Sequence, residues 1–340
     1  MLVHNLIFYP GGKRDFYEHM KPYFPRDMRI FVEPFFGGGS TSLGVLSDPD
    51  FNKLEGVVAS ELAPEVFSLW KGVRDYPNEV IETIDQFWRS YCPHVIEANT
   101  FNGVVTPHTK ALGNIDEYLS KLSDEEYNKS ELKYQLQVYE QAVEEGKRFW
   151  EWATTVDTST LNLVQRAART YLINRTSFSG LGDSGSMSRV KLVQFSLSKP
   201  VEDIPYTSNL LQRVEIFNQS YTETFKLVNE NPNGVFVFLD PPYFKQEGSG
   251  LYGRNGDTHL GFNHEEFARL TKELKAPWFV TYDDSIKVRK MFEGCHIKNF
   301  RLPRGYTLAG KTAENALDGE ELFIANFKLE TDSFDNMSLL

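Results

Sequence analysis

One apolar run, VFVFL at residues 235–239, constrains the fold more than any other feature of the sequence. Every position in it is apolar, so the strand that it predicts must be covered on both faces, as central strands of parallel sheets are. The run stops at Asp240, and the prolines that follow, Pro241 and Pro242, fix the backbone and lack amide donors. The sequence therefore predicts a buried strand that ends in a rigid corner bearing one carboxylate.

Other apolar runs of strand length lie on both sides of a long helical region. They occupy residues 28–34, 54–61, 214–218, 276–284, 295–300 and 320–327, and helices are predicted at 64–75 and 263–274. Strands that alternate with helices are typical of an open, mostly parallel α/β sheet. We therefore expect a Rossmann-like α/β domain built from residues 1–62 and 216–340, with an inserted, mainly helical domain at 63–215.

Composition and cysteine content exclude several classes of protein. The 340 residues are 41% hydrophobic, which is enough for a substantial core, and no apolar run approaches the roughly 20 residues that span a bilayer. The two cysteines, Cys92 and Cys295, are far apart and indicate no disulfide framework. Cys92, His94 and His108 share one stretch, but their spacing fits no tetrahedral metal site. We expect neither a membrane segment nor a metal.

Charge is spread unevenly along the chain. The formal net charge is −11, and residues 116–151 are strongly acidic. Residues 160–200, in contrast, carry one acidic side chain, Asp183, against the basic side chains of Arg166, Arg169, Arg175, Arg189, Lys191 and Lys199. If the protein binds a polyanion, we expect it to bind there. An ordinary solvated surface is the alternative for each of these side chains.

A glycine-rich turn, EPFFGGGS at residues 33–40, follows the first predicted strand. Open α/β sheets bind their ligands at such a place, and Glu61 stands where an acid would hold a ribose. The phosphate-binding patterns G-x-G-x-x-G and G-K-S/T are absent. The turn therefore favours a nucleoside cofactor without a pyrophosphate, although a glycine turn can also be purely structural.

A second glycine turn, YPGGK at residues 9–13, lies near the start of the chain. It places an aromatic ring at Tyr9 and a cation at Lys13 on one short segment, which suits a purine ring and an anionic group. The alternative is a tight turn with no ligand.

The corner at Asp240 suits an amine that has two hydrogens to donate. The carboxylate and the neighbouring Asp240–Pro241 backbone carbonyl are two acceptors, while Tyr243 and Phe244 offer flat apolar faces to a planar base. The alternative is that the prolines only end a strand.

These residues together resemble a known family. YPGGK (9–13), VEPFFGGGS (32–40), INRTSFSGL (173–181), FVFLDPPYF (236–244), GFNHEEFARL (261–270), FVTYDDS (279–285) and EELFIANF (320–327) occur in the order seen in DNA N6-adenine methyltransferases of the Dam type. The resemblance implies a Rossmann-like methyltransferase sheet with a helical target-recognition domain. It also implies S-adenosylmethionine as methyl donor and double-stranded DNA as substrate, with the target adenine flipped out of the helix.

The resemblance also implies roles for individual residues. The cofactor would be bound by Tyr9, Gly11, Gly12, Lys13, Glu33, Pro34, Phe35, Gly37, Gly39, Ser40, Glu61 and Asp240. The target adenine would be held by Asp240, Pro241, Pro242 and Tyr243. DNA would be contacted through Arg166, Arg169, Arg175, Arg189 and Lys191, with Asn174 supporting the local structure.

The reaction implied is direct methyl transfer to adenine N6 without a covalent enzyme intermediate, in service of DNA modification or protection from restriction. Two alternatives stay open: an amino-methyltransferase for cytosine N4, RNA or a protein glutamine, and a DNA-binding protein without activity. We expect a monomer or weak dimer in the cytoplasm of a bacterial or phage-infected cell, associated with the nucleoid. A cognate restriction endonuclease is a further partner if the chain serves in restriction–modification.

Overall fold

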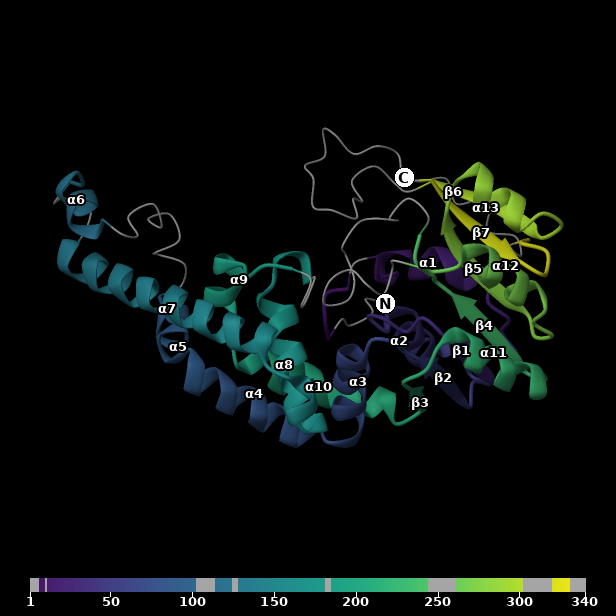
Figure 1. The fold of residues 1–340 in the computed structure, drawn as a ribbon, viewed down its shortest axis with the longest axis horizontal. Helices are drawn as coiled ribbons and strands as arrows, with labels where there is room; N and C mark the ends of the chain where they lie inside the picture. The colour runs from purple at the N-terminus through teal and green to yellow at the C-terminus, as the bar shows by residue number, and fades with distance from the viewer. Residues whose placement is uncertain are drawn as a thin grey trace.

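A seven-stranded sheet forms one end of the protein, and helices extend from it as an arm (Figure 1). The computed structural model describes residues 6–9, 11–101, 114–123, 128–180, 185–243, 261–301 and 320–330. Side chains of Ser179, Arg301 and Glu320 are not described. The predictions for Phe244 and His108 lie outside the described residues.

All the predicted strands are present in one sheet. They are β1 (Ile30–Glu33), β2 (Gly56–Ser60), β3 (Val214–Phe217), β4 (Val235–Leu239), β5 (Trp278–Asp283), β6 (His296–Arg301) and β7 (Glu320–Ala325). Their order is β3-β2-β1-β4-β5-β7-β6. Neighbouring strands are parallel except at β7, which is antiparallel to both β5 and β6. The predicted Rossmann-like, mostly parallel α/β sheet is confirmed.

The α-helices of the described residues are α1 (Tyr17–Met20), α2 (Ser40–Ser47), α3 (Pro64–Asp75), α4 (Pro77–Tyr91), α5 (Pro93–Asn99), α6 (Ile115–Ser120), α7 (Lys129–Thr155), α8 (Leu163–Thr176), α9 (Arg189–Gln194), α10 (Ser198–Leu211), α11 (Tyr221–Glu230), α12 (His264–Lys272) and α13 (Ile286–Met291). Helices α3 to α10 all lie between β2 and β3 along the chain, and the other helices lie before or between the remaining strands. Three consecutive helices begin with proline, at Pro64, Pro77 and Pro93, where the missing amide costs nothing.

Strand β4 was predicted to be covered on both faces, and the structure confirms this. All five side chains of β4 are buried. Phe236 and Phe238 pack into one hydrophobic cluster, in which their rings meet Phe24. Val237 and Leu239 belong to a second cluster on the opposite face, together with side chains of α11, α12 and α13. Side chains alternate between the two faces because successive residues of a strand point in opposite directions.

The helical arm shares its core with the sheet. The hydrophobic cluster that contains Phe31 of β1 also contains Trp70 of α3, Trp88 of α4, Phe149 of α7 and Tyr171 of α8. The sheet strand β3 begins at Val214, inside the stretch predicted as the insert. The division of the chain into residues 1–62 with 216–340 and 63–215 stays a prediction.

Candidate active site

The strand order of the sheet reverses between β1 and β4, and open α/β sheets bind ligands outside the carboxyl ends of the strands at such a point. Glu33 is the last residue of β1, and Asp240 directly follows β4. The fold therefore brings the predicted glycine turn and the predicted carboxylate corner to the same edge of the sheet.

Hydrogen bonds to Glu61 and from Trp70 hold the glycine turn. The Gly37 amide donates to Glu61 Oε2 at 2.9 Å, and the Trp70 indole donates to the Gly37 carbonyl at 2.8 Å. Gly37 has a φ of 47°, and a Cβ built there would lie 2.6 Å from the Tyr9 ring. Glycine is therefore required at position 37 both for its backbone conformation and for the close approach of Tyr9.

Glu33 is a buried carboxylate beneath this turn. Its Oε2 accepts hydrogen bonds from the Ser42 amide, at 3.1 Å, and from the Ser42 hydroxyl. The pKa of Glu33 is raised to about 8, because burial and the charges of Asp240 and Glu61 outweigh the Ser42 hydrogen bonds, which lower it. Three carboxylates therefore act on one another at this edge, and a cationic ligand would relieve their repulsion.

Glu61 lies at the end of β2, as predicted for a ribose-binding acid. Besides the Gly37 amide it accepts the Ala63 amide at 2.8 Å, so it anchors both the glycine turn and the start of α3. Burial raises the pKa of Glu61, and these backbone hydrogen bonds oppose the shift. Each carboxylate oxygen has a second lone pair, which leaves Glu61 able to accept ligand hydroxyls.

Lys13 connects the two glycine turns to the carboxylate corner. Its backbone amide donates to Ser40 Oγ at 3.1 Å, and its Nζ lies 3.0 Å from Asp240 Oδ1 and 3.0 Å from the Gly11 carbonyl. The side chain is only 3% exposed. Burial opposes its charge, but the negative charges of Asp240 and Glu321 outweigh that effect and raise the pKa of Lys13. Lys13 is therefore a buried ammonium bound to the carboxylate that was predicted to hold the target amine.

The remaining neighbours of Asp240 complete the corner. Thr281 of β5 donates its hydroxyl to Asp240 Oδ1 at 2.7 Å. The Tyr243 ring is stacked on Tyr282 at a centroid distance of 5.8 Å, and Lys13 Nζ lies 4.8 Å from the Tyr243 centroid. Tyr243 is thus buried beneath Lys13. Pro241 is buried and Pro242 half-buried beside it.

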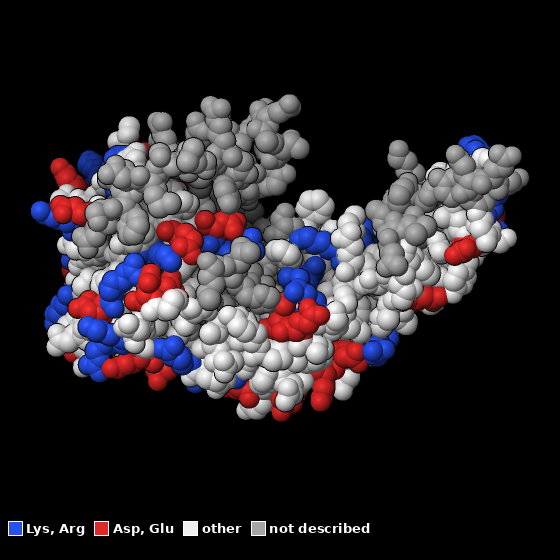
Figure 2. All heavy atoms as spheres, turned by 180° about the vertical axis from the view of Figure 1, so that it is seen from behind, with Lys and Arg blue, Asp and Glu red and all other residues white. Residues whose placement is uncertain are grey.

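The predicted DNA-contacting side chains separate into two groups. Arg175 of α8 and Lys191 of α9 lie 4.7 and 4.4 Å from the ring centroid of Phe8, which is 42% exposed. Burial lowers the pKa of Lys191, and the charge of Arg175 adds to this. We call Phe8, Arg175 and Lys191 the Phe8 cluster. Figure 2 shows Lys and Arg side chains in the concave middle of the molecule, between the sheet end and the far end of the arm.

Asn174 fixes the position of the Phe8 cluster. Its Oδ1 accepts the Phe8 amide at 2.8 Å, and its Nδ2 donates to the carbonyls of Phe8, at 2.6 Å, and Gly180, at 3.0 Å. These hydrogen bonds support the structural role expected for Asn174. They also hold the segment at Phe8 and Tyr9 against the end of α8, so the Phe8 cluster lies next to the glycine turn that begins at Tyr9.

For Arg169 the predicted DNA contact is wrong. Its side chain is 1% exposed and donates Nε to the Ala153 carbonyl at 2.5 Å, so it joins α7 to α8 inside the arm. Arg166 is half-buried, and its Nε has no hydrogen-bond partner among the described residues. Arg189 is exposed, and its charge lowers the pKa of Glu144 on α7, although Lys147 lowers it more.

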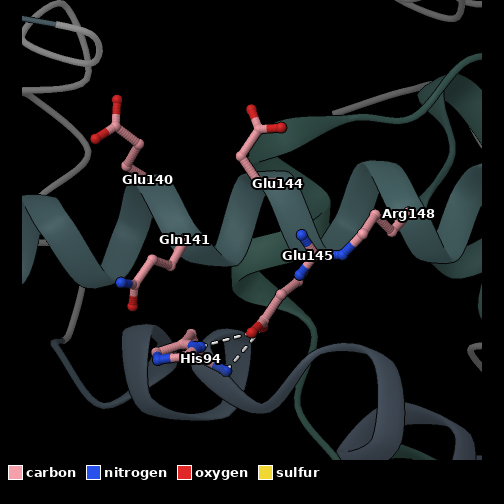
Figure 3. Close-up of a pocket in the computed structure, with 6 residues that line it drawn as sticks. All are labelled: His94, Glu140, Gln141, Glu144, Glu145 and Arg148. Atoms are coloured by element: carbon pink, nitrogen blue, oxygen red, sulfur yellow. Dashed lines mark hydrogen bonds and ion pairs between the residues drawn. The ribbon is translucent and has the colours of Figure 1, made fainter.

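A separate hollow lies in the arm between α5 and α7, far along the chain from the sheet edge. It is lined by His94, Glu140, Gln141, Glu144, Glu145 and Arg148. Figure 3 shows Glu145 turned toward His94, whose amide and Nδ1 lie 2.9 and 2.5 Å from its two carboxylate oxygens. Glu140 and Glu144 point away. The described residues contain no cluster of three or more His, Cys, Asp and Glu side chains that would hold a metal.

Several residues of the site carried no predicted role. Thr281 and Glu321 were visible only as polar positions within apolar strands, and Trp70 and Phe8 as aromatic residues among many. A polar side chain inside a buried strand is the one local signal that could have indicated Thr281 and Glu321.

Comparison with known proteins identifies the family of the chain. The model of the D12 class N6 adenine-specific DNA methyltransferases matches residues 9–304. The chain belongs to this family, as the resemblance indicated.

Two curated relatives are named as type II methyltransferases. One is the type II methyltransferase M.CviBI of Paramecium bursaria Chlorella virus NC1A, which is 22% identical over 334 residues, covering 95% of this chain and 99% of the relative. The other is the type II methyltransferase M1.LlaDCHI of Lactococcus lactis subsp. cremoris, which is 22% identical over 270 residues, covering 76% of this chain and 72% of the relative.

None of the helices within the described ranges could span a bilayer.

Proposed function

We propose that the protein transfers a methyl group from S-adenosylmethionine to the N6 amine of an adenine flipped out of double-stranded DNA. The observation that carries the proposal is the position of Asp240. This carboxylate lies at the reversal point of the sheet, on a corner made rigid by two prolines, and is linked through Lys13 and Ser40 to the glycine turn.

The residues at the glycine turn suit this cofactor. S-adenosylmethionine has an ammonium group, a positively charged sulfur and ribose hydroxyls, and it lacks a pyrophosphate. Glu33 and Glu61 are buried carboxylates at the ends of β1 and β2, and their mutual repulsion favours a cationic ligand. We assign Glu33 to the ammonium group and Glu61 to the ribose, with Tyr9 and the backbone of the turn enclosing the adenosyl group.

Asp240 and the Asp240–Pro241 carbonyl would orient the target amine. When both hydrogens of the N6 amine are held by acceptors, its lone pair points toward the methyl group. Bound S-adenosylmethionine would supply an electrophilic methyl group, which would pass to N6 as the neutral thioether leaves, and N6 would then release one proton to water. Neither step needs a cysteine, and burial raises the pKa of the arm's Cys92 thiol to about 12.

Entry of the target amine requires a change at Lys13. In the structure, Lys13 Nζ occupies a hydrogen-bonding position on Asp240 and covers one face of Tyr243. An incoming adenine would take both places, with its amine on Asp240 and its ring against Tyr243. Lys13 therefore keeps the carboxylate neutralised while no base is bound.

The Phe8 cluster would bind the DNA backbone next to the flipped nucleotide. Arginine and lysine side chains that neutralise phosphates provide most of the affinity of such proteins for DNA. Arg175 and Lys191 stand next to the cofactor turn, and the acidic surface of α7 lies farther along the arm. The remaining helices of the arm would then read the recognition sequence. The biological role that we propose is host or phage DNA modification, or protection from a cognate restriction endonuclease.

The proposal is tested by incubating the protein with S-adenosylmethionine carrying a labelled methyl group and unmethylated double-stranded DNA. We expect label in DNA as N6-methyladenine at one short sequence, which mapping of the modified bases would identify. Asp240→Ala should abolish transfer while S-adenosylhomocysteine still binds, and Asp27→Asn, a change at an exposed aspartate, should leave transfer intact. Label in cytosine, RNA or protein, or in no substrate at all, would contradict the proposal.

A further inference from the structure

We propose that Glu321 is a positioning residue, which receives the Lys13 ammonium when the target amine displaces it from Asp240. The inference rests on the proposed function and adds a residue to which no role has been given. Glu321 is on β7, the antiparallel strand that pairs with β5 and β6. It reaches the site from a segment about 300 positions away from Lys13 in the sequence.

Glu321 is a buried carboxylate with weak partners. Its side chain is 4% exposed, and neither carboxylate oxygen forms a hydrogen bond of ordinary geometry with the described residues, although the Tyr243 side chain interacts with it. Buried carboxylates are normally paired or hydrogen-bonded, because removal from water is costly. The ion pair between Glu321 and the Lys13 ammonium is long, at 3.9 Å, so Glu321 can still bind that ammonium at closer range.

The distances place Lys13 between two carboxylates. Its Nζ lies 3.0 Å from Asp240 Oδ1 and 3.9 Å from Glu321 Oε1. A shift of Nζ by about 1 Å toward Glu321 would give an ordinary charge-assisted hydrogen bond. The backbone of Lys13 stays fixed by its bond to Ser40, so the side chain alone can make this movement.

The other charged and titratable groups around Glu321 make the movement favourable. Burial raises the pKa of Glu321, and the charges of Asp240 and Asp283 also raise it, whereas the charge of Lys13 and a hydrogen bond from Tyr243 lower it. Tyr243 supplies no positive charge, so Lys13 is the cation among these groups. Closer approach of Lys13 would therefore stabilise an acid that its acidic neighbours repel.

Without Glu321, base entry would leave a buried ammonium unpaired. Breaking one partner of a buried ion pair is strongly unfavourable because the remaining charge has no compensation. With Glu321, one carboxylate binds Lys13 while the other binds the amine, and the total charge of the site stays constant. Glu321 therefore acts on entry of the base, through Lys13, and touches neither substrate nor cofactor.

The test compares Glu321→Gln, Lys13→Met and the double variant on a duplex that contains the mapped recognition site. Base entry is followed with 2-aminopurine at the target position, whose fluorescence rises when the base leaves the stack, and KM and kcat are measured separately. We expect Glu321→Gln to weaken base entry and raise the KM for DNA roughly 10- to 100-fold, with S-adenosylhomocysteine binding unchanged. Glu265→Gln, at an exposed glutamate of α12, is the matched control and should resemble the wild type.

In the Lys13→Met background, Glu321→Gln should have no further effect on base entry, because the ammonium that it serves is gone. A loss of the same size in both backgrounds, or wild-type base entry in Glu321→Gln, would overturn the inference. Failure of the proposed function looks different, since the wild-type protein would then methylate no adenine in DNA.

Discussion

The glycine turn and the predicted DNA face differ in how closely their residues are held together. At the turn, Gly37, Glu61 and Trp70 are joined by backbone and side-chain hydrogen bonds, and the turn lies directly after a strand. Among the arginines of residues 160–200, Arg175 lies over Phe8 whereas Arg169 is buried in the arm. Strand ends therefore predict which residues the fold brings together better than a count of charges does.

The largest expected effect tests the sheet-edge side of this comparison. Asp240→Asn keeps the shape of the corner but removes its charge and replaces one acceptor oxygen with an NH2 donor, so the target amine and Lys13 both lose a charged acceptor. We expect methyl transfer to fall about 100- to 1,000-fold. S-adenosylhomocysteine binding, measured by calorimetry, should persist, and a thermal melt should show that the variant folds. Transfer at the wild-type rate would show that the corner does not orient the amine.

A second prediction asks whether the close packing of the turn is necessary. Gly37→Ala places a Cβ 2.6 Å from Tyr9 at a φ of 47°, whereas Gly294→Ala has a φ of 87° with no atom within 4 Å. Backbone strain at either site costs about 1–3 kcal/mol, and only Gly37→Ala adds a clash. Thermal melts should show the greater loss for Gly37→Ala, and cofactor affinity should fall only there. Equal effects would mean that Tyr9 does not constrain the turn.

The raised pKa of Glu33 predicts a pH dependence of cofactor binding. Because its pKa is about 8, Glu33 is mostly neutral below that pH in the free protein. It must therefore lose a proton to pair with the cofactor's ammonium. Affinity should therefore rise with pH, by up to about tenfold per unit for one proton, and level off above pH 8. Calorimetry with S-adenosylhomocysteine measures this slope, and Glu33→Gln should flatten it. A slope that survives in Glu33→Gln would assign the proton to another group.

The smallest effect concerns the DNA face. Arg175→Ala should weaken DNA binding by about 1 kcal/mol and reduce the slope of log affinity against log salt by about 1, because one phosphate contact is lost. Arg169→Met should lower the melting temperature and leave that slope unchanged, since Arg169 is bonded to the Ala153 carbonyl inside the arm. Fluorescence anisotropy at several salt concentrations distinguishes the two. A changed salt slope for Arg169→Met would show that Arg169 contacts DNA.

The strands, the glycine turn and the carboxylate corner were predictable from local sequence patterns. These features are local: an apolar run predicts a buried strand, and glycine or proline at its end sets the backbone, whatever lies elsewhere in the chain. β4 and Asp240 therefore stand where the pattern placed them.

The pairing of charged side chains, in contrast, became apparent only in the folded structure. Lys13, Asp240 and Glu321 come from three distant segments, and nothing in their local sequence specifies that one ammonium lies between two carboxylates. The same holds for Arg169 and Arg175, which are six positions apart on one helix yet face the interior of the arm and the Phe8 ring, respectively. The burial and partners of a charged side chain depend on the segments that pack around it, and those are set only when the whole chain has folded.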